Sequence, residues 1–136
     1  MSLQLRCETD FVARNPAFGD AAATMARACL SAGGATGISL QDVSLDELMG
    51  HPTSATDSIT VGGLLGSLLA TVGEKVELSR GLLLNAEGGA VGAYSHPGGA
   101  YGSLVAARVT NDGTVDDKWV LAFVVLPGLL RVVDMP

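Results

Sequence analysis

Apolar residues recur at helical spacing in two segments of the chain. The first stripe, at intervals of four, three and four residues, consists of Phe18, Ala22, Met25 and Cys29. It is preceded by Asn15, a favoured N-cap, and by Pro16, which fits the first helical position. The pattern predicts a helix that begins at Pro16 and ends at Gly33-Gly34. We interpret its stripe as part of the core rather than as a binding groove.

The second apolar stripe matches the amphipathic helix template in full. It consists of Val61, Leu64, Leu65, Leu68, Leu69 and Val72. Thr60 can cap this helix and Gly73 ends it. Glycines inside the segment each cost up to about 1 kcal/mol relative to alanine, whereas each buried leucine contributes roughly 1.5–3 kcal/mol. We therefore expect the helix to form only when it packs against a sheet.

Alternating apolar and polar positions predict strands. The expected strands are residues 2–6, 75–85, 91–96 and 101–109. In the second of them, the apolar residues expected on one face are Val76, Leu78, Leu82 and Leu84. Short glycine-containing turns connect the last three strands, which predicts an antiparallel meander. The fold class is therefore α+β, an antiparallel sheet of three or more strands covered by the two helices.

The first predicted strand, residues 2–6, needs a partner for its backbone groups, because buried amides and carbonyls are almost always hydrogen-bonded. We expect this partner to be residues 75–85 or residues 101–109. Because the chain begins inside this strand, we also expect it to be a fragment of a longer protein.

The segment from residue 35 to residue 59 is rich in serine, threonine, glycine and aspartate and is predicted to be a loop. Within it, a short helix at residues 45–49 is expected. Ser44 would cap this helix, with Glu47 three residues further on as in a capping box.

The end of the chain has no clear period. Residues 119–126 are apolar and fit either a buried helix or a strand, and their β-branched content favours the strand. Asp116-Asp117 would suit a helix N-terminus. The length of 136 residues fits a single domain, residues 1–136, in which residues 110–136 start a further element.

Charge and hydropathy exclude two classes of partner. The net charge is −6, and no two of the eight Lys and Arg residues adjoin, so no basic patch for a nucleic acid is expected. The longest apolar run is interrupted by Pro127 and Gly128 and is too short to cross a membrane.

The sequence lacks the motifs of the common catalytic sites. There is no phosphate-binding G-x-x-x-x-G-K-[ST] and no G-x-S-x-G nucleophile elbow. Cys7, Cys29, His51 and His96 do not have the spacing of metal ligands. Neither an enzyme nor a cofactor or metal is predicted. A small hydrolase that uses Ser95 and His96 would require an acid near His96 in space.

The nine residues 7–15, Cys-Glu-Thr-Asp-Phe-Val-Ala-Arg-Asn, form a corner between the first strand and the first helix. Asp10 and Phe11 fall at its apex. An acid beside a large aromatic on a short connection is typical of a binding element on a rigid scaffold. The alternative is that Phe11 tucks under the corner and packs on the core. The residues alone leave both open.

This corner resembles the signature of the elongation factor Ts family, a Cys-(Glu/Gln)-Thr-Asp-Phe-Val-Ala-(Arg/Lys) run between a strand and a helix. Three further blocks resemble the family in the same order: residues 69–75, LATVGEK; residues 87–96, EGGAVGAYSH; and residues 101–105, YGSLV. The resemblance covers residues 2 to about 109. It departs from the family at Lys75, where the family has asparagine, and at Ser79, where the family has arginine.

The resemblance implies a core domain that binds elongation factor Tu and promotes GDP release in translation elongation. It implies that Phe11 inserts into the GTPase, that Asp10 disturbs the magnesium site, and that Val72, Gly73 and His96 make further contacts. The family's N-terminal module and a second core module are missing from this chain, so the alternative is a non-catalytic assembly module. The long polar loop favours a mitochondrial matrix protein, with the bacterial cytoplasm as the alternative. The oligomeric state is left open, a homo-oligomer included.

Overall fold

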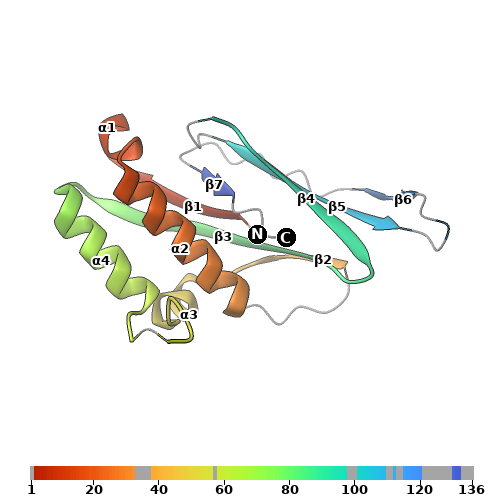
Figure 1. The fold of residues 1–136 in the computed structure, drawn as a ribbon, viewed down its shortest axis with the longest axis horizontal. Coiled ribbons are helices and arrows are strands. Elements are labelled where there is room, and N and C mark those ends of the chain that lie inside the picture. Colours follow the sequence, from red (N-terminus) through yellow and green to blue (C-terminus); the bar gives the residue numbers. More distant parts are fainter. Residues whose placement is uncertain are drawn as a thin grey trace.

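A computed structural model describes residues 2–32, 38–56, 58–97, 101–109, 112, 115–120 and 130–132. The helices in this part are α1 Asp10–Ala13, α2 Pro16–Ala32, α3 Leu45–Gly50 and α4 Val61–Val72. The strands are β1 Ser2–Cys7, β2 Ile38–Asp42, β3 Val76–Ala86, β4 Gly89–Ser95, β5 Gly102–Val109, β6 Val115–Val120 and β7 Leu130–Val132. The fold is α+β, as predicted, with antiparallel strands in two sheets (Figure 1).

Both long helices begin where their caps predict. The Oδ1 atom of Asn15 accepts a hydrogen bond from the Ala17 N–H at 2.9 Å, at the start of α2. The Thr60 hydroxyl accepts from the Gly63 N–H at 3.1 Å, at the start of α4. Gly73 ends α4 in the left-handed region, with φ 72°, which is a conformation that glycine adopts without strain. The predicted stop of α2 at Gly33-Gly34 lies outside the described residues.

The main core lies between the helices and β1 and β3. Its largest fully buried members include Leu3 and Leu5 of β1, Met25 of α2, Leu48 of α3 and Val61 of α4. The first predicted stripe is buried throughout. Within the second stripe, Leu65 and Leu68 are buried but Leu69 is 38% exposed, because a stripe this wide reaches the edge of the helix face.

The first sheet has the strand order β2-β3-β1-β7. β1 pairs with β3, one of the two partners expected for it, and on its other side with β7 rather than β5. β2 was not expected, since it falls within the predicted loop at residues 35–59. It is only five residues long and contains polar side chains, so the local pattern does not identify it as a strand. It is defined instead by its pairing with β3. The short helix predicted after it is confirmed, with the Ser44 hydroxyl accepting from the Glu47 N–H.

The second sheet, of order β4-β5-β6, is a meander of consecutive strands. The meander predicted from the sequence began one strand earlier, with residues 75–85, and this part of the prediction is wrong. In the structure β3 lies between β2 and β1 in the first sheet, whereas β4 pairs with β5 in the second sheet. Val115–Val120 is a strand, so Asp116-Asp117 do not begin a helix. Residues 121–126 of the ambiguous segment lie outside the described residues.

A β-bulge at Ser79 changes which face β3 presents. In the pairing with β1, Gln4 faces Arg80 and Leu5 faces Leu78, so Ser79 is the extra residue. Before the bulge, Val76 and Leu78 pack on the helix side. After it, the alternation is reversed, and the expectation that all four apolar residues share one face is wrong.

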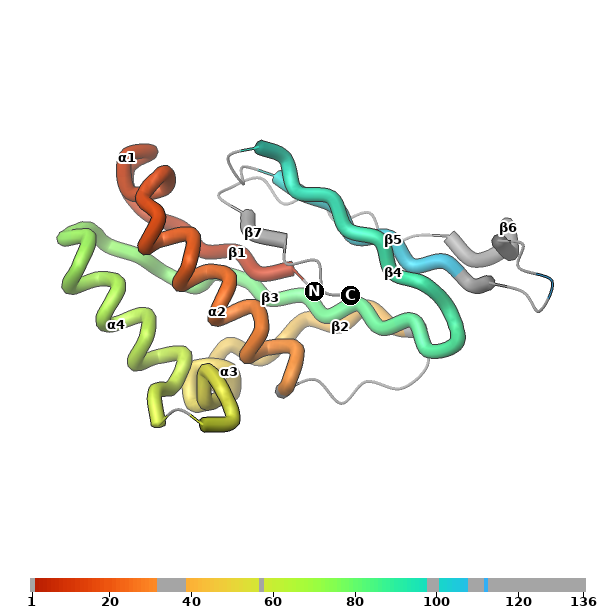
Figure 2. The backbone as a smooth tube through the Cα atoms, in the orientation of Figure 1, coloured from red at the N-terminus to blue at the C-terminus, as the bar shows by residue number. Residues whose placement is uncertain are grey.

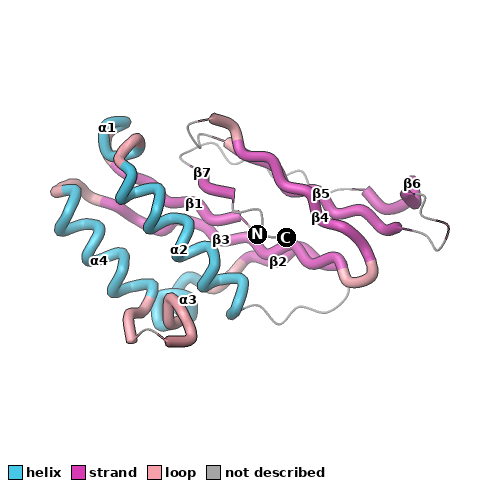
Figure 3. Tube along the Cα trace, in the orientation of Figure 1, coloured by secondary structure: helices cyan, strands magenta, loops and turns pink. Residues whose placement is uncertain are grey.

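Leu83 and Leu84 show the result of this reversal. Leu83 packs against the helix-side core, whereas Leu84 joins Leu104 and Ala106 of β5 in a second apolar cluster. Neighbouring strand residues point to opposite faces. β3 is therefore covered by helices on one face and, towards its end, by the second sheet on the other. Figure 3 shows the helices gathered on one side of the first sheet. None of the helices in the described part is long and apolar enough to span a membrane.

Candidate functional site

The corner between β1 and α2 contains a single helical turn, α1. Thr9 is its N-cap, with extended backbone (φ −125°, ψ 156°) and a hydroxyl that accepts from the Val12 N–H at 3.5 Å. The turn is closed by backbone hydrogen bonds from the Arg14 N–H to the Asp10 carbonyl and from the Asn15 N–H to the Val12 carbonyl. The predicted strand-to-helix corner is therefore confirmed, with one helical turn at its apex.

Phe11 and Val12, adjacent in sequence, have opposite environments. Phe11 is 83% exposed, whereas Val12 is 7% exposed and belongs to the main core. Of the two interpretations left open by the sequence, the one that tucks Phe11 under the corner is wrong, because Val12 occupies that place. An aromatic ring held in solvent by a buried neighbour is available for a partner.

Asp10 lies beside Phe11 and pairs with Arg14 on the same turn. Asp10 Oδ2 and Arg14 Nη2 are 3.2 Å apart, and their side chains are 67% and 81% exposed. An ion pair this exposed contributes roughly 0–1 kcal/mol. Asp10 can therefore exchange Arg14 for another partner at small cost.

Glu74 joins the corner to the end of α4. Its Oε2 accepts from the Thr9 N–H at 3.2 Å, and both of its carboxylate oxygens accept from the Thr9 hydroxyl, at 2.8 and 2.9 Å. The two residues are 65 positions apart and both are partly buried. Figures 1 and 2 show α1 and the end of α4 at the same end of the molecule.

The sequence contains a separate local signal for each residue of this pair. Thr9 directly precedes the predicted apex, and Glu74 directly follows the glycine that ends α4, and both fall within blocks of the family resemblance. Their contact could not be inferred because nothing in the local pattern brings residue 9 to residue 74.

Val72 and Gly73, the other expected contacts at this end, differ from each other. Val72 is partly buried and packs against the core, while Gly73 is exposed. The structure thus brings Asp10, Phe11 and Gly73 to one end of the molecule (Figure 1), with Val72 packed against the core at the end of α4.

His96 lies at the tip of the β4–β5 hairpin, as predicted. Its backbone N–H donates to the Tyr101 carbonyl at 2.9 Å. Its ring stacks on Tyr101, with ring centroids 4.2 Å apart and planes at 17°, and its Nδ1 is 3.1 Å from the Tyr94 hydroxyl. The sequence did not indicate that these two tyrosines would enclose His96. The contacts described for the His96 ring are to tyrosines, so the acid that a Ser95–His96 hydrolase requires is not among them.

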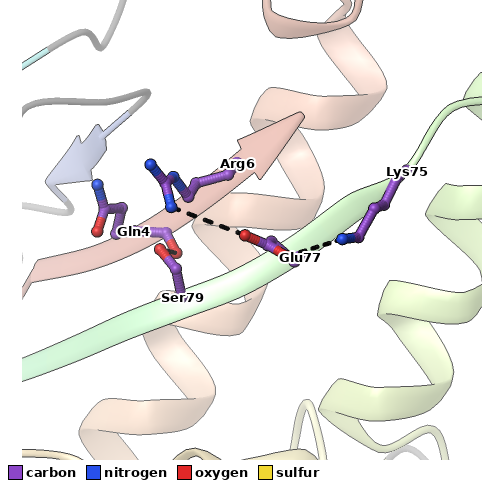
Figure 4. A network of polar contacts seen from close by, with 5 residues as sticks. All are labelled: Gln4, Arg6, Lys75, Glu77 and Ser79. Atoms are coloured by element: carbon purple, nitrogen blue, oxygen red, sulfur yellow. Dashed lines mark hydrogen bonds and ion pairs between the residues drawn. The ribbon is translucent and has the colours of Figure 1, made fainter. Parts of the chain in front are cut away.

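A polar network covers the outer face of β1 and β3 beside the corner (Figure 4). Glu77 pairs with Arg6 at 3.8 Å and with Lys75 at 3.4 Å, and the Ser79 hydroxyl donates to the Gln4 carbonyl at 3.3 Å. All three charged side chains are about half exposed or more. Lys75 and Ser79, the two departures from the family pattern, both belong to this network. Ser79 joins β3 to β1 through its hydrogen bond, and Lys75 pairs with Glu77 on the surface of β3.

Neither cysteine is poised as a nucleophile. Burial, and secondly the charge of Glu74, raises the pKa of the Cys7 thiol, which donates to the Thr9 carbonyl at 3.2 Å. Burial raises the pKa of Cys29 to about 11. Nucleophilic cysteines instead have lowered pKa values. Within the described residues, no group of three His, Cys, Asp or Glu side chains could hold a metal ion.

With this geometry established, comparison with known proteins defines the class. The family model described as "Elongation factor TS" matches residues 8–121, so the chain belongs to the elongation factor Ts family. It is 37% identical over 105 residues to elongation factor Ts of Trichlorobacter lovleyi, covering 77% of this chain and 31% of the relative. It is 39% identical over 104 residues to elongation factor Ts of Chlorobaculum tepidum, and the match covers 76% of this chain and 34% of the relative.

A more distant relative gives the same result. Elongation factor Ts of Rhizobium etli is 31% identical over 115 residues, which cover 81% of this chain and 34% of the relative. The chain therefore spans about a third of the length of the curated relatives it matches.

Proposed function

We propose that this chain is a guanine-nucleotide exchange factor that binds elongation factor Tu and accelerates GDP release in translation elongation. The observation that carries the proposal is the exposure of Phe11, 83%, on a turn fixed from below by buried Val12 and from the side by Glu74. A large apolar ring exposed to water does not stabilise the free protein. Such exposure is expected of a ring that enters a pocket on a partner, because aromatic anchors often dominate binding.

Exchange requires displacement rather than covalent chemistry. Mg²⁺ demands near-ideal octahedral geometry, so a small shift of the loops around a magnesium–phosphate site weakens GDP binding. In our proposal, the Phe11 ring supplies the displacement and the Asp10 carboxylate acts beside it on the magnesium site. Arg14 would release Asp10 for this role, because the exposed Asp10–Arg14 pair is weak.

Gly73 and Val72 would form the neighbouring contact, and His96 would form a separate one from the hairpin tip. Linkage makes the effect reciprocal: a factor that weakens GDP binding is itself bound more weakly by the GDP form. The proposed partner is a protein, and neither a nucleic acid nor a membrane is part of the proposal. The bacterial origin of the relatives described above favours the bacterial cytoplasm over the mitochondrial matrix.

The direct test is stopped-flow release of a fluorescent GDP analogue from elongation factor Tu, with increasing concentrations of the purified chain and an excess of unlabelled GDP. We expect the release rate to rise with concentration and then to saturate. No acceleration up to concentrations at which the two proteins form a complex would overturn the exchange function.

Complex formation without acceleration is instead the outcome expected of the non-catalytic assembly module. Size-exclusion chromatography of the mixture with nucleotide-free elongation factor Tu distinguishes the two functions. An exchange factor stabilises the nucleotide-free form, whereas an assembly module is not expected to bind that form preferentially.

A further inference from the structure

The turn that carries Phe11 is too short to be stable by itself. A first helical turn fixes several backbone dihedrals for one hydrogen bond, so isolated short helices are marginal. α1 has only four residues. Phe11 cannot orient the turn, because its ring is 83% exposed and has little to pack on. The direction of the ring must therefore be set by contacts of the neighbouring residues.

Besides the weak hydrogen bond that the Cys7 thiol donates to the Thr9 carbonyl, two contacts can do this. Val12 enters the core below the turn, which fixes the position of α1 but leaves rotation about that anchor. The second contact is the carboxylate of Glu74, which accepts from both the Thr9 N–H and the Thr9 hydroxyl. Because the same hydroxyl accepts from the Val12 N–H, the chain of hydrogen bonds runs from Glu74 through Thr9 into the turn.

The surroundings leave Glu74 available for this contact. Gly73, in the left-handed conformation, ends α4 and turns the backbone immediately before Glu74. The nearby cation Lys75 pairs with Glu77, on the outer face of the sheet. Hydrogen bonds to a charged acceptor are roughly twice as strong as neutral ones, and the partial burial of both residues protects them from water.

We propose that Glu74 is a positioning residue for the corner: through Thr9 it fixes the orientation of α1, and with it the exposed ring of Phe11, relative to the end of α4. The consequence for exchange rests on the function proposed above. Glu74 makes the two parts of the proposed contact surface, Asp10–Phe11 and Val72–Gly73, a single rigid unit before the partner binds, which reduces the ordering cost of association.

The test compares Glu74→Gln with Glu77→Gln, a matched loss of one carboxylate three residues away, whose ion pairs are with Arg6 and Lys75. Thr9→Val and Thr9→Ser form a second pair: valine removes the hydroxyl at nearly constant shape, and serine retains it. Amide hydrogen exchange is measured by NMR in each variant, at a temperature well below its melting point. We expect at least tenfold faster exchange at the Thr9 and Val12 amides in Glu74→Gln, and at the Val12 amide in Thr9→Val, which loses its acceptor. The Leu5 amide should be unchanged as an internal reference.

Release of GDP from elongation factor Tu is the functional readout. We expect Glu74→Gln and Thr9→Val to need about tenfold more protein for half-maximal acceleration, which is the loss expected for a charge-assisted hydrogen bond. Glu77→Gln and Thr9→Ser should stay within twofold of the unaltered chain. Rescue by serine separates positioning from a general loss of stability, which both Thr9 variants would share.

Unchanged amide hydrogen exchange at Thr9 and Val12 in Glu74→Gln overturns the proposal. Faster amide hydrogen exchange with no change in GDP release also overturns it when the unaltered chain is active. If Glu74→Gln does not fold, the Thr9 pair decides alone. If the unaltered chain does not accelerate GDP release, the proposed function fails, and the amide exchange still decides whether Glu74 orients the corner.

Discussion

The corner at α1 and the tip of the β4–β5 hairpin both carry residues proposed to contact the partner, but the fold holds them in different ways. At the corner, the supporting contacts come from far along the chain: Glu74 reaches Thr9 across 65 positions, and Val12 enters the core. At the tip, the support is local, because His96 rests on Tyr94 and Tyr101 of the same hairpin.

This difference follows from where each element sits. α1 lies over the main core, where a single buried side chain can anchor it. β4 is an edge strand whose residues are mostly exposed, so the tip has little core to use and is ordered by aromatic stacking instead. A rigid corner suits a residue that must displace a loop. A locally ordered tip suits a second contact that adds affinity.

The largest effect should come from the core under the corner. Leu68→Ala should reduce the free energy of unfolding by about 2–5 kcal/mol, because Leu68 is 4% exposed in the main core. Leu69→Ala, one residue further along the same helix, is the matched control. Leu69 is 38% exposed, and its loss should cost clearly less. Denaturant unfolding measures both, and equal losses would contradict the assignment of the inner face of α4.

The second prediction separates the corner's binding role from its stability. Phe11→Ala should leave the melting temperature nearly unchanged because the ring is exposed, yet weaken the interaction with elongation factor Tu by about 2 kcal/mol, roughly thirtyfold. Ile59→Ala is the control, since Ile59 is an exposed apolar residue at 55% in another part of the chain. GDP release and thermal melting are recorded on the same samples. A marked fall in melting temperature with normal exchange would make Phe11 a structural residue.

The third prediction concerns the acid beside the ring. Asp10→Ala should lower the maximal rate of GDP release several-fold while changing the half-saturating concentration less, if the carboxylate acts at the magnesium site. Arg14→Ala removes the same ion pair but keeps the carboxylate, so it should leave the maximal rate intact. Neither should change unfolding by more than roughly 0.5 kcal/mol, as expected of an exposed pair. Equal loss of rate in both would assign the effect to the pair rather than to Asp10.

The sequence predicted the parts of this fold that depend on local chemistry. The caps at Asn15 and Thr60, the stop at Gly73 and the apolar stripes are each contained in a few neighbouring residues, and all are found where expected. The corner was found for the same reason: Asp10 and Phe11 are adjacent.

What the sequence did not predict depends on pairing between distant residues. β2 is short, and what makes it a strand is its antiparallel pairing with β3. The bulge at Ser79 reverses the faces of β3, and it arises from the register with β1. The contact between Thr9 and Glu74 belongs to the same class. The two residues were visible separately, but no periodic pattern relates them.

The smallest effect is expected at the hairpin tip, and it tests whether local support matters there. Tyr94→Phe removes the hydroxyl that lies 3.1 Å from His96 Nδ1 and keeps the ring. One exposed hydrogen bond contributes about 1 kcal/mol at most, so we expect the half-saturating concentration in GDP release to rise by no more than about fivefold. Tyr101→Phe is the control, because it preserves the ring that stacks on His96.

The hydroxyl of Tyr94 can donate to or accept from Nδ1 of His96, depending on the tautomer of the ring. If it donates to Nδ1, the neutral ring carries its proton on Nε2, which can then donate to an acceptor on the partner. His96→Ala should raise the half-saturating concentration at least as much as Tyr94→Phe, since it removes the imidazole ring together with its hydrogen bond to Tyr94. If Tyr94 acts only through His96, the double variant should have the same half-saturating concentration as His96→Ala alone. A further rise in the double variant would show that Tyr94 has a contact of its own with the partner.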